Sequence, residues 1–180
     1  MEKRDWISMD EVYLDKILAG DSDAYRYFIN TYKDMALNIA VSIVKDDQYA
    51  EEVAQDAFVK AFSGIKSFNR ESKFSTWFYR IVVNESFQRL RKLKKEVPTT
   101  DINEVSFKKT SANESDEDRE RIEKALKALP ANESLALNLF YLEENSLKEV
   151  MNITGWTLAN TKVILHRARK NLRSKMEKTK

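Results

Sequence analysis

The side chains of this sequence that are best suited to chemistry with a partner are basic and amide groups, gathered in two segments. Residues 162–180 contain eight Lys or Arg and one Glu, and residues 70–95 contain eight basic and two acidic side chains. A single basic run is equally well explained as a solvated helix face. Two separated runs, each ending a block of apolar periodicity, favour two contacts with a polyanion.

The later basic run belongs to a predicted helix-turn-helix. Asn145 or Ser146 can cap a short helix, Gly155 lies in a turn, and Thr157 opens a longer basic helix. At about 100° per residue, one stripe of the longer helix faces inward: Leu158, Thr161, Leu165, Ala168 and Leu172. In such motifs the first turns of the second helix meet base edges in the major groove. Helical hairpins with a glycine turn also occur without DNA, so the pattern alone leaves that alternative open.

The outward face of this last helix carries the candidate base-reading residues. Asn160 is suited to adenine and Val163 to a thymine methyl group, although sideways packing of Val163 on a neighbouring helix stays open. His166 is assigned to a phosphate or groove contact, because a lone histidine has no catalytic partner here. Phosphate contacts give affinity without reading sequence, and we assign them to Lys162, Arg167, Arg169, Lys170 and Arg173.

The earlier basic run alternates with aromatic side chains. Aromatic faces stack on unpaired bases, and cations follow the nucleic-acid backbone. Trp77 and Phe78 fall on the predicted inward stripe, so we assign them first to the core. Tyr79, Phe87 and the loop 69–73 are therefore the better candidates for contacts with single-stranded or locally opened DNA.

A third segment has the opposite charge. Residues 46–57 contain five acidic and no basic side chains. Metal binding there is disfavoured, because no His or Cys joins the carboxylates and no ligand spacing is present. Two interpretations remain: a solvated helix N-terminus that the helix dipole favours, or a surface for a basic or polar protein partner.

The composition disfavours most other classes of protein. The chain has no Cys and one His, which excludes disulfides, thiolate metal sites and multi-histidine sites. It also lacks a glycine-rich phosphate loop, so we expect no catalytic residues, no metal and no cofactor. No run approaches about 18 consecutive apolar residues, and the N-terminus lacks the apolar centre of a signal peptide. We therefore expect a cytoplasmic protein without membrane insertion.

The elements that must position these residues are predicted to be helices. Three glycines and two prolines among 180 residues are far below the roughly 12% of ordinary proteins, and sheets need many turns. Apolar spacing predicts helices over 10–19, between 22 and 46, between 47 and 65, and up to 95, the last capped by Ser75 or Thr76.

The helical period stops after residue 95. Residues 96–118 have the composition of a flexible linker. The predicted fold class is therefore all-α, with two small helical domains, 1–95 and 119–180, on either side of the linker 96–118. The second domain contains the helix-turn-helix. Each domain is small for an independent core, so a docked partner is expected.

The order of the motifs resembles one known family. Five segments carry the resemblance, in this order along the chain: ILAGDSDAYRYFINTY, YAEEVAQDAFVKAF, FSTWFYRIVVNESFQRLRK, ALPANESLALNLFYLEENSLKEV and TKVILHRARKNL. In this order, around a variable linker, they resemble the extracytoplasmic-function (ECF) sigma factors of bacterial RNA polymerase, in the sigma-70 family. The resemblance covers about residues 14–95 and 120–176. It implies a non-enzymatic factor that binds core RNA polymerase and directs promoter-specific transcription initiation.

The resemblance also implies a partner for each charged segment. The helix that binds the clamp coiled coil of the largest polymerase subunit is matched by Glu51, Glu52, Gln55, Asp56 and Phe58. The surface that melts the promoter −10 element and holds it single-stranded is matched by Asn69, Arg70, Ser72, Lys73, Arg80, Asn84, Arg89, Arg91 and Lys92. The helix that reads the duplex −35 element is matched by Thr157, Asn160, Lys162, Val163, His166, Arg167, Arg169 and Lys170. An anti-sigma factor is a further expected partner, and the acidic linker is expected to enter the polymerase channels.

The sequence departs from the family pattern in two places. Ala159, Val163 and Ile164 stand where recognition helices of the family often have Gly, Ser and Arg, so a different −35 sequence is expected. The loop has Arg70 and its neighbours where a glycine is common. The main alternative is a stand-alone helix-turn-helix regulator, which would bind duplex DNA stably without polymerase; a carboxylate–metal hydrolase is disfavoured by the composition.

Overall fold

The computed structural model describes residues 8–96, 121–122 and 124–177 of the chain. Within these ranges every regular element is helical, which confirms the predicted all-α class. The predicted linker lies outside the described residues except at its first position, so the domain boundaries stay predictions. None of the described helices combines the length and the apolar run that crossing a bilayer would need.

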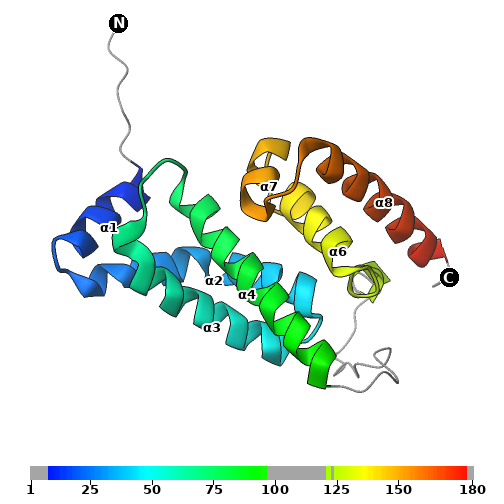
Figure 1. Cartoon of the computed structure of the whole chain (residues 1–180), viewed down its shortest axis with the longest axis horizontal. Helices are drawn as coiled ribbons and strands as arrows, with labels where there is room; N and C mark the ends of the chain where they lie inside the picture. Colours follow the sequence, from blue (N-terminus) through cyan, green and yellow to red (C-terminus); the bar gives the residue numbers. More distant parts are fainter. Residues whose placement is uncertain (1–7, 97–120, 123, 178–180) are drawn as a thin grey trace, which may run out of the picture.

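The N-terminal block is built on three long helices. It begins with α1 (Met9–Leu18) and the 3-10 helix η1 (Ser22–Tyr25). The long helices then follow, with one short 3-10 helix between the last two: α2 (Arg26–Val44), α3 (Asp47–Gly64), η2 (Ile65–Ser67) and α4 (Phe74–Glu96). Each long helix packs against the other two, and Figure 1 shows α2, α3 and α4 lying side by side.

The C-terminal block lies along one side of this three-helix unit (Figure 1). Its described residues 121–122 and 124–127 are helical. The elements that follow are α6 (Ala131–Leu137), the π-helical turn η3 (Asn138–Leu142), α7 (Leu147–Thr154) and α8 (Leu158–Glu177). Helix α6 contacts α2, α7 contacts α4, and α8 packs on both α6 and α7. The last helix is therefore held on the outer side of the block.

Most helix ends follow local signals in the sequence. Ser8 and Ser146 form capping boxes at the starts of α1 and α7, and Asp46 accepts a hydrogen bond from the backbone N–H of Tyr49 at 2.9 Å at the start of α3. Gly155 ends α7 with a left-handed φ of 75°.

The predicted cap of α4 is wrong. The helix begins at Phe74, so Ser75 and Thr76 lie inside its first turn, and Thr76 is buried. The carbonyl of Lys73 accepts the backbone N–H of Trp77 at 3.2 Å. The buried ring of Phe74 explains the earlier start, because it packs 4.2 Å from the ring of Phe28 and draws the first turn onto the core.

Two features fill the core of the N-terminal block. Helix α3 turns small side chains toward α2 and α4: Ala50, Val53, Ala54, Ala57 and Ala61. Aromatic rings fill the space between α2 and α4, with Phe28, Phe74 and Phe78 nearly or fully buried. Tyr79, predicted to be free for contacts, is buried beside Tyr32 and belongs to this aromatic layer.

The same apolar core continues into the C-terminal block. Leu135, Leu139, Val150 and Ile153 are fully buried or nearly so, and they belong to one cluster with the buried residues of α2, α3 and α4. The two blocks, separate along the sequence, therefore share one large apolar cluster, while two smaller clusters lie within the C-terminal block.

Several large apolar residues of these helices are partly exposed. Ile29, Phe62, Ile122 and Leu158 are 39%, 42%, 42% and 45% exposed, respectively. Periodicity defines the direction of a stripe but not its width, and residues at its edge stay in contact with water where no neighbouring element covers them. Two of these, Ile29 and Phe62, lie together and matter for the site below.

Truncation of one buried ring tests this core. Phe28→Ala is expected to lower the free energy of unfolding by about 3–5 kcal/mol, because Phe28 is fully buried and its loss leaves a cavity. Urea denaturation followed by circular dichroism measures the loss. The control Val59→Ala, at an exposed position of α3, is expected to cost no more than about 0.5 kcal/mol. Equal losses in the two variants would contradict the packing described.

Candidate nucleic-acid interface

The helix-turn-helix is formed by α7, the turn at Gly155, and α8. The hydroxyl of Thr157 accepts the backbone N–H of Asn160 at 3.2 Å, so Thr157 caps α8 as predicted. The buried row of α8 consists of Thr161, Ile164, Leu165 and Ala168. Leu158, expected on this row, precedes the first buried residue by one turn and stays exposed at the free end of the helix.

The opposite side of α8 is polar, basic and open to solvent. Every residue predicted to contact −35 DNA is exposed: Thr157, Asn160, Lys162, Val163, His166, Arg167, Arg169 and Lys170. Val163 is 46% exposed, so nearly half of the residue is open to solvent. Arg169 differs from the others, because its Nη1 donates to the Tyr141 hydroxyl at 3.2 Å and it lies toward η3.

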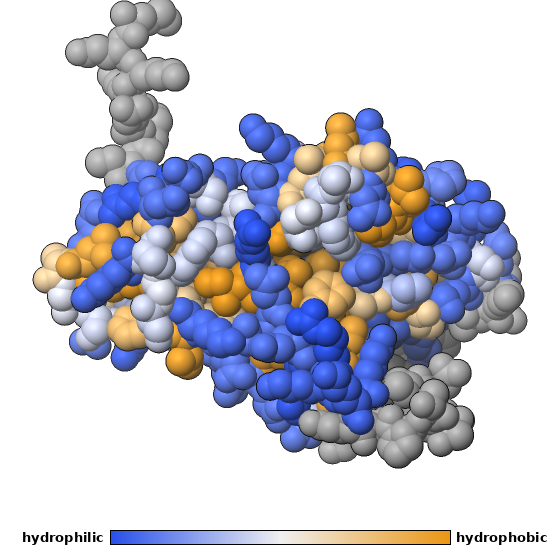
Figure 2. All heavy atoms as spheres, viewed as in Figure 1, coloured by the Kyte–Doolittle hydropathy of each residue, from blue (hydrophilic) through white to orange (hydrophobic). Residues whose placement is uncertain are grey.

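The residues predicted for −10 DNA lie on the loop before α4 and along α4. All are exposed except Arg89, which is half-buried: Asn69, Arg70, Ser72, Lys73, Arg80, Asn84, Arg91 and Lys92 are the exposed ones. Figure 2 shows hydrophilic surface over the end of α4 and apolar surface in the seam between α4 and the C-terminal block. Arg89 donates to Glu52 at 3.0 Å and lies 4.2 Å from the centre of the Tyr49 ring.

The loop 69–73 is tied to the rest of the chain at both ends. Arg70 adopts a left-handed φ of 59°, the conformation that glycine adopts most easily, and its guanidinium pairs with Asp15 of α1. The Asn69 side chain accepts the backbone N–H of Glu71 at 3.2 Å, an Asx turn that favours the bend. An arginine therefore adopts a backbone conformation that favours glycine, and an ion pair ties it to α1.

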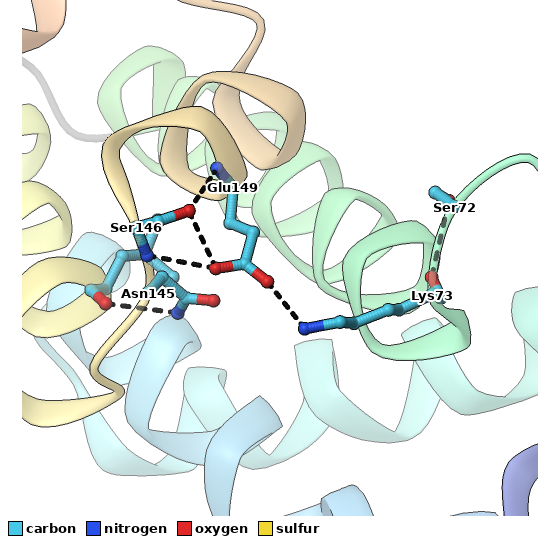
Figure 3. A network of polar contacts seen from close by, with 6 residues as sticks. Ser72, Lys73, Asn145, Ser146 and Glu149 are labelled. Carbon is cyan, nitrogen blue, oxygen red and sulfur yellow. Dashed lines mark hydrogen bonds and ion pairs between the residues drawn. The ribbon is translucent and has the colours of Figure 1, made fainter. Parts of the chain in front are cut away.

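Lys73, at the other end of the loop, contacts the C-terminal block. Its Nζ lies 2.8 Å from Oε1 of Glu149 on α7 (Figure 3). The other oxygen of Glu149 accepts the backbone N–H and the hydroxyl of Ser146, at 3.0 and 2.9 Å. The Lys73 ammonium, followed by the two Ser146 donors, lowers the pKa of Glu149 to about 2. One carboxylate thus caps α7 and neutralises a lysine predicted for DNA.

Asn84 and Arg91, also predicted for −10 DNA, border a hollow between the blocks. The hollow has a volume of about 520 Å³, and Phe87 joins them in lining it from α4. Its opposite wall consists of residues from the C-terminal block, namely Asn132, Thr154 and Trp156. The candidate surface for opened DNA is therefore walled on one side by the chain itself.

The acidic part of α3 forms a separate surface. Glu51, Glu52, Gln55 and Asp56 are exposed, as a contact surface requires. Phe58 differs, because it is half-buried with its ring 4.6 Å from that of Phe78.

Sequence reasoning missed the apolar continuation of this acidic face. Val59 and Phe62, 65% and 42% exposed, follow the carboxylates along α3. With Ile29 of α2 they border a groove of about 410 Å³, whose floor includes Tyr25 and Phe58. The signal was present at Val59, an apolar residue on the polar side of the predicted helix. For Phe62 no signal was available, since it lies at the edge of the predicted stripe.

The described residues bring together no group of three His, Cys, Asp or Glu side chains placed to hold a metal ion. The carboxylates at the start of α3 are instead used as a helix cap and in contacts with basic side chains. Asp46 caps α3, and Asp47 lies 3.7 Å from Lys127 in an ion pair.

Comparison with known proteins shows which class of protein this chain resembles. Residues 28–96 match the family model of sigma-70 region 2. The chain is 29% identical to the ECF RNA polymerase sigma factor SigW of Bacillus subtilis over 174 residues, covering 89% of this chain and 93% of that protein. It is 25% identical to the ECF RNA polymerase sigma-E factor of Escherichia coli over 181 residues, covering 93% and 94%. The chain is therefore similar, over most of its length, to proteins of the sigma-70 family.

Two solved structures have the same fold. CnrH, in complex with the cytosolic domain of CnrY, aligns with a TM-score of 0.72 at 17% identity, covering 96% of this chain and all of that chain. The sigma factor RpoE of Bartonella quintana, in complex with the anti-sigma factor NepR, aligns with a TM-score of 0.68 at 22% identity, covering 85% and 96%. The chain is similar to ECF sigma factors over nearly its whole length, and it acts in promoter-specific transcription initiation rather than as a stand-alone helix-turn-helix regulator.

The ion pair of Glu149 makes the stability of the chain depend on pH. The pKa of Glu149 is about 2 in the folded chain against an ordinary 4.5, so its contribution is complete above 4.5 and is lost as the pH falls toward 2. Glu149→Gln should therefore lower the free energy of unfolding more at about pH 7 than at about pH 3.5. Urea denaturation at both pH values measures this, with Glu144→Gln on the preceding loop as the control. The same loss at both pH values would contradict the assignment.

Proposed function

We propose that this chain binds core RNA polymerase through α3 and contacts promoter DNA through two further surfaces, one on α4 with its preceding loop and one on α8. The observation that carries the proposal is the exposed row of Asn160, Val163 and Arg167 opposite the buried row of α8, within a helix-turn-helix. A basic helix held by its apolar side on α6 and α7 is free to enter a major groove.

The −35 element of the promoter is assigned to α8. Asn160 and Val163 lie in its first two turns, where base edges are read. Arg167 and Lys170 lie further along the same exposed side and are placed to hold phosphates. Ile164 is buried, so the position at which family members often carry a base-reading arginine has a core role here. We infer a −35 sequence read by amide and apolar contacts.

The −10 element is assigned to the loop 69–73 and α4. Lys73, Asn84 and Arg91 offer cations and an amide along one solvent-accessible path. The half-buried Phe87 lines the same hollow and offers a ring on which an unpaired base can stack. Extrusion of a base from the duplex costs a few kcal/mol, which contacts of this kind offset.

The polymerase is assigned to the acidic and apolar face of α3. We propose that Glu51, Gln55 and Asp56 meet basic or polar groups of the clamp coiled coil, as the resemblance implies. Val59 and Phe62 then fill the centre of the contact with Ile29, since apolar side chains in a groove beside charges are typical of an interface centre with a polar rim. Glu52 takes part only if its ion pair with Arg89 opens.

Three further features belong to the same proposal. The chain has no catalytic activity of its own and acts in the cytoplasm, where the polymerase is. An anti-sigma factor is a regulatory partner; RpoE of Bartonella quintana is similar to this chain and was solved with one. The linker 96–118 enters the polymerase channels.

Run-off transcription with core polymerase and a library of genomic fragments tests the function. The chain should produce fragment-specific transcripts that core polymerase alone does not. Phe62→Asp should weaken binding to core polymerase by about 2 kcal/mol, or about thirtyfold, because it places a charge at the centre of an apolar contact. Leu18→Asp, at a similarly exposed position of α1, is the matched control. Absence of any specific transcript would overturn the function, and unchanged binding of Phe62→Asp would overturn the polymerase surface.

The assignment of α8 predicts two different kinds of defect. Val163→Ala should change the preferred −35 bases, whereas Arg167→Ala should weaken binding equally for all sequences and reduce the salt slope by about one. Both are measured with the chain bound to core polymerase on promoters from the run-off experiment. Lys33→Ala, an exposed change on α2, should alter neither property. If Val163→Ala left base preference unchanged, the groove assignment would be wrong.

A further inference from the structure

We propose that the hollow between α4 and the C-terminal block binds a small ligand, namely a free purine nucleotide. The inference goes beyond the proposed function, which assigns Asn84, Phe87 and Arg91 of this hollow to promoter DNA and gives no role to its opposite wall. It rests on three features of the lining: two aromatic rings, three amides, and an arginine that has no acidic partner among the described residues.

The hollow has the size and the position of a ligand site. Its volume of about 520 Å³ falls within the roughly 300–1,000 Å³ that is usual for small-molecule pockets. One wall is formed by α4 between Val83 and Arg91, and the other by α6, the end of α7 and the turn before α8. A ligand in the hollow can therefore contact both blocks at once.

One aromatic ring comes from each wall. Phe87 of α4 and Trp156 of the turn before α8 are half-buried, so both remain partly open to solvent. Trp156 is held in place, because it packs on two apolar clusters and its backbone N–H donates to the Thr154 hydroxyl at 3.2 Å. Aromatic side chains of this kind stack on the flat face of a nucleobase. A purine gains more from such stacking than a pyrimidine does, because it covers more apolar surface.

Three amide side chains line the same hollow. Asn84 and Gln88 lie one turn apart on α4, and Asn132 lies on the opposite wall. All three residues are exposed, so a ligand can reach them. Each amide group offers both hydrogen-bond donors and an acceptor, which complement the mixed donors and acceptors along the edge of a purine base. The amides therefore favour a base over a purely apolar ring.

The charge of the lining favours an anionic group on the ligand. Arg91 is exposed, and no acidic side chain among the described residues pairs with it. Glu85, which also lines the hollow, is matched by Lys60 of α3, with 2.5 Å between Nζ and Oε2. A guanidinium group is suited to a phosphate, which it can hold through two parallel hydrogen bonds. A base that carries a phosphate therefore fits the lining better than a base alone.

Such a base can come from a free nucleotide or from a DNA strand, and the opposite wall favours the free nucleotide. A strand carries a further phosphate beyond each neighbouring sugar, and cations normally hold these phosphates. Asn132, Thr154 and Trp156 offer polar groups and a ring, but no cation. A single nucleotide needs only the phosphate contact of Arg91 and uses the groups of both walls.

Isothermal titration calorimetry of the isolated full chain tests the site, with GMP and AMP as the ligands. At least one of them should bind with a dissociation constant below about 1 mM. The matching nucleoside should bind at least about tenfold more weakly, because it leaves Arg91 without a phosphate. Tryptophan fluorescence then locates the ligand. The nucleotide should quench the fluorescence, Trp156→Phe should remove most of this change while keeping a ring in place, and inorganic phosphate should cause none.

Two pairs of variants connect the binding to the two walls. Arg91→Gln should weaken nucleotide binding about tenfold and abolish the difference between nucleotide and nucleoside. Its matched control is Lys94→Gln, an exposed change on the same helix. Asn132→Ala should weaken binding about threefold, and its control is Asn152→Ala, exposed on α7 outside the lining. Neither control should change the affinity. All four positions are exposed, so circular dichroism should show the fold of the wild type.

Other outcomes overturn the proposal. If neither nucleotide bound at about 1 mM, the hollow would not be a nucleotide site. Full affinity of Asn132→Ala, with unchanged quenching in Trp156→Phe, would place the ligand elsewhere. A short single-stranded oligonucleotide that bound where GMP and AMP did not, and that Asn132→Ala weakened, would assign the hollow to DNA instead. These measurements need neither polymerase nor promoter, so their outcome is independent of run-off transcription and of the proposed function.

Discussion

The close packing of α3 between α2 and α4 is the constraint on which the other surfaces depend. The buried side of α3 is almost all alanine, which lets its backbone approach its neighbours more closely than larger side chains would allow. With so little side-chain volume on that face, the aromatic rings of α2 and α4 must fill the rest of the core. Helix α3 is thereby fixed with its acidic residues, Val59 and Phe62 on the outside.

The same packing brings oppositely charged segments of the sequence together. Acidic residues of α3 and α7 meet basic residues of the loop, α4 and the segment before α6, in the pairs Glu52–Arg89, Glu149–Lys73 and Asp47–Lys127. The near-neutral net charge of +2 therefore combines surfaces of opposite sign that partly neutralise one another. Each pair joins one largely exposed side chain to one that is partly or mostly buried.

Much of the fold could be predicted from the sequence, because helices leave local and periodic signals. The caps at Ser146 and Thr157 and the turn at Gly155 were each found from neighbouring residues. Periodicity could not predict which other elements pack against a given part of a helix. Tyr79 is buried by rings that are distant in sequence, and Leu158 is exposed because no element covers the first turn of α8.

The same distinction applies to the candidate site: contacts within one helix could be predicted, and contacts between distant elements could not. The exposure of the α8 residues was predictable, because one helix with a single apolar stripe determines it. The ion pair of Lys73 with Glu149 and the hollow that Asn84 shares with Asn132 were not, because both involve residues separated by the linker and by more than 45 positions in the sequence. Arg70 is the clearest example of this difference. The sequence shows that the loop has no glycine, but only the fold shows that Asp15 lies beside the loop and pairs with Arg70.

The size of the two blocks explains why they pack on each other. Blocks of this length bury a smaller fraction of their surface than larger domains do, so each keeps an apolar face that gains free energy when it is covered. In this structure the faces of α6, η3 and α7 cover that of α2 and α4. Polar contacts lie at the edges of this apolar seam, where Lys73 pairs with Glu149 and Lys45 donates to the carbonyl of Leu126.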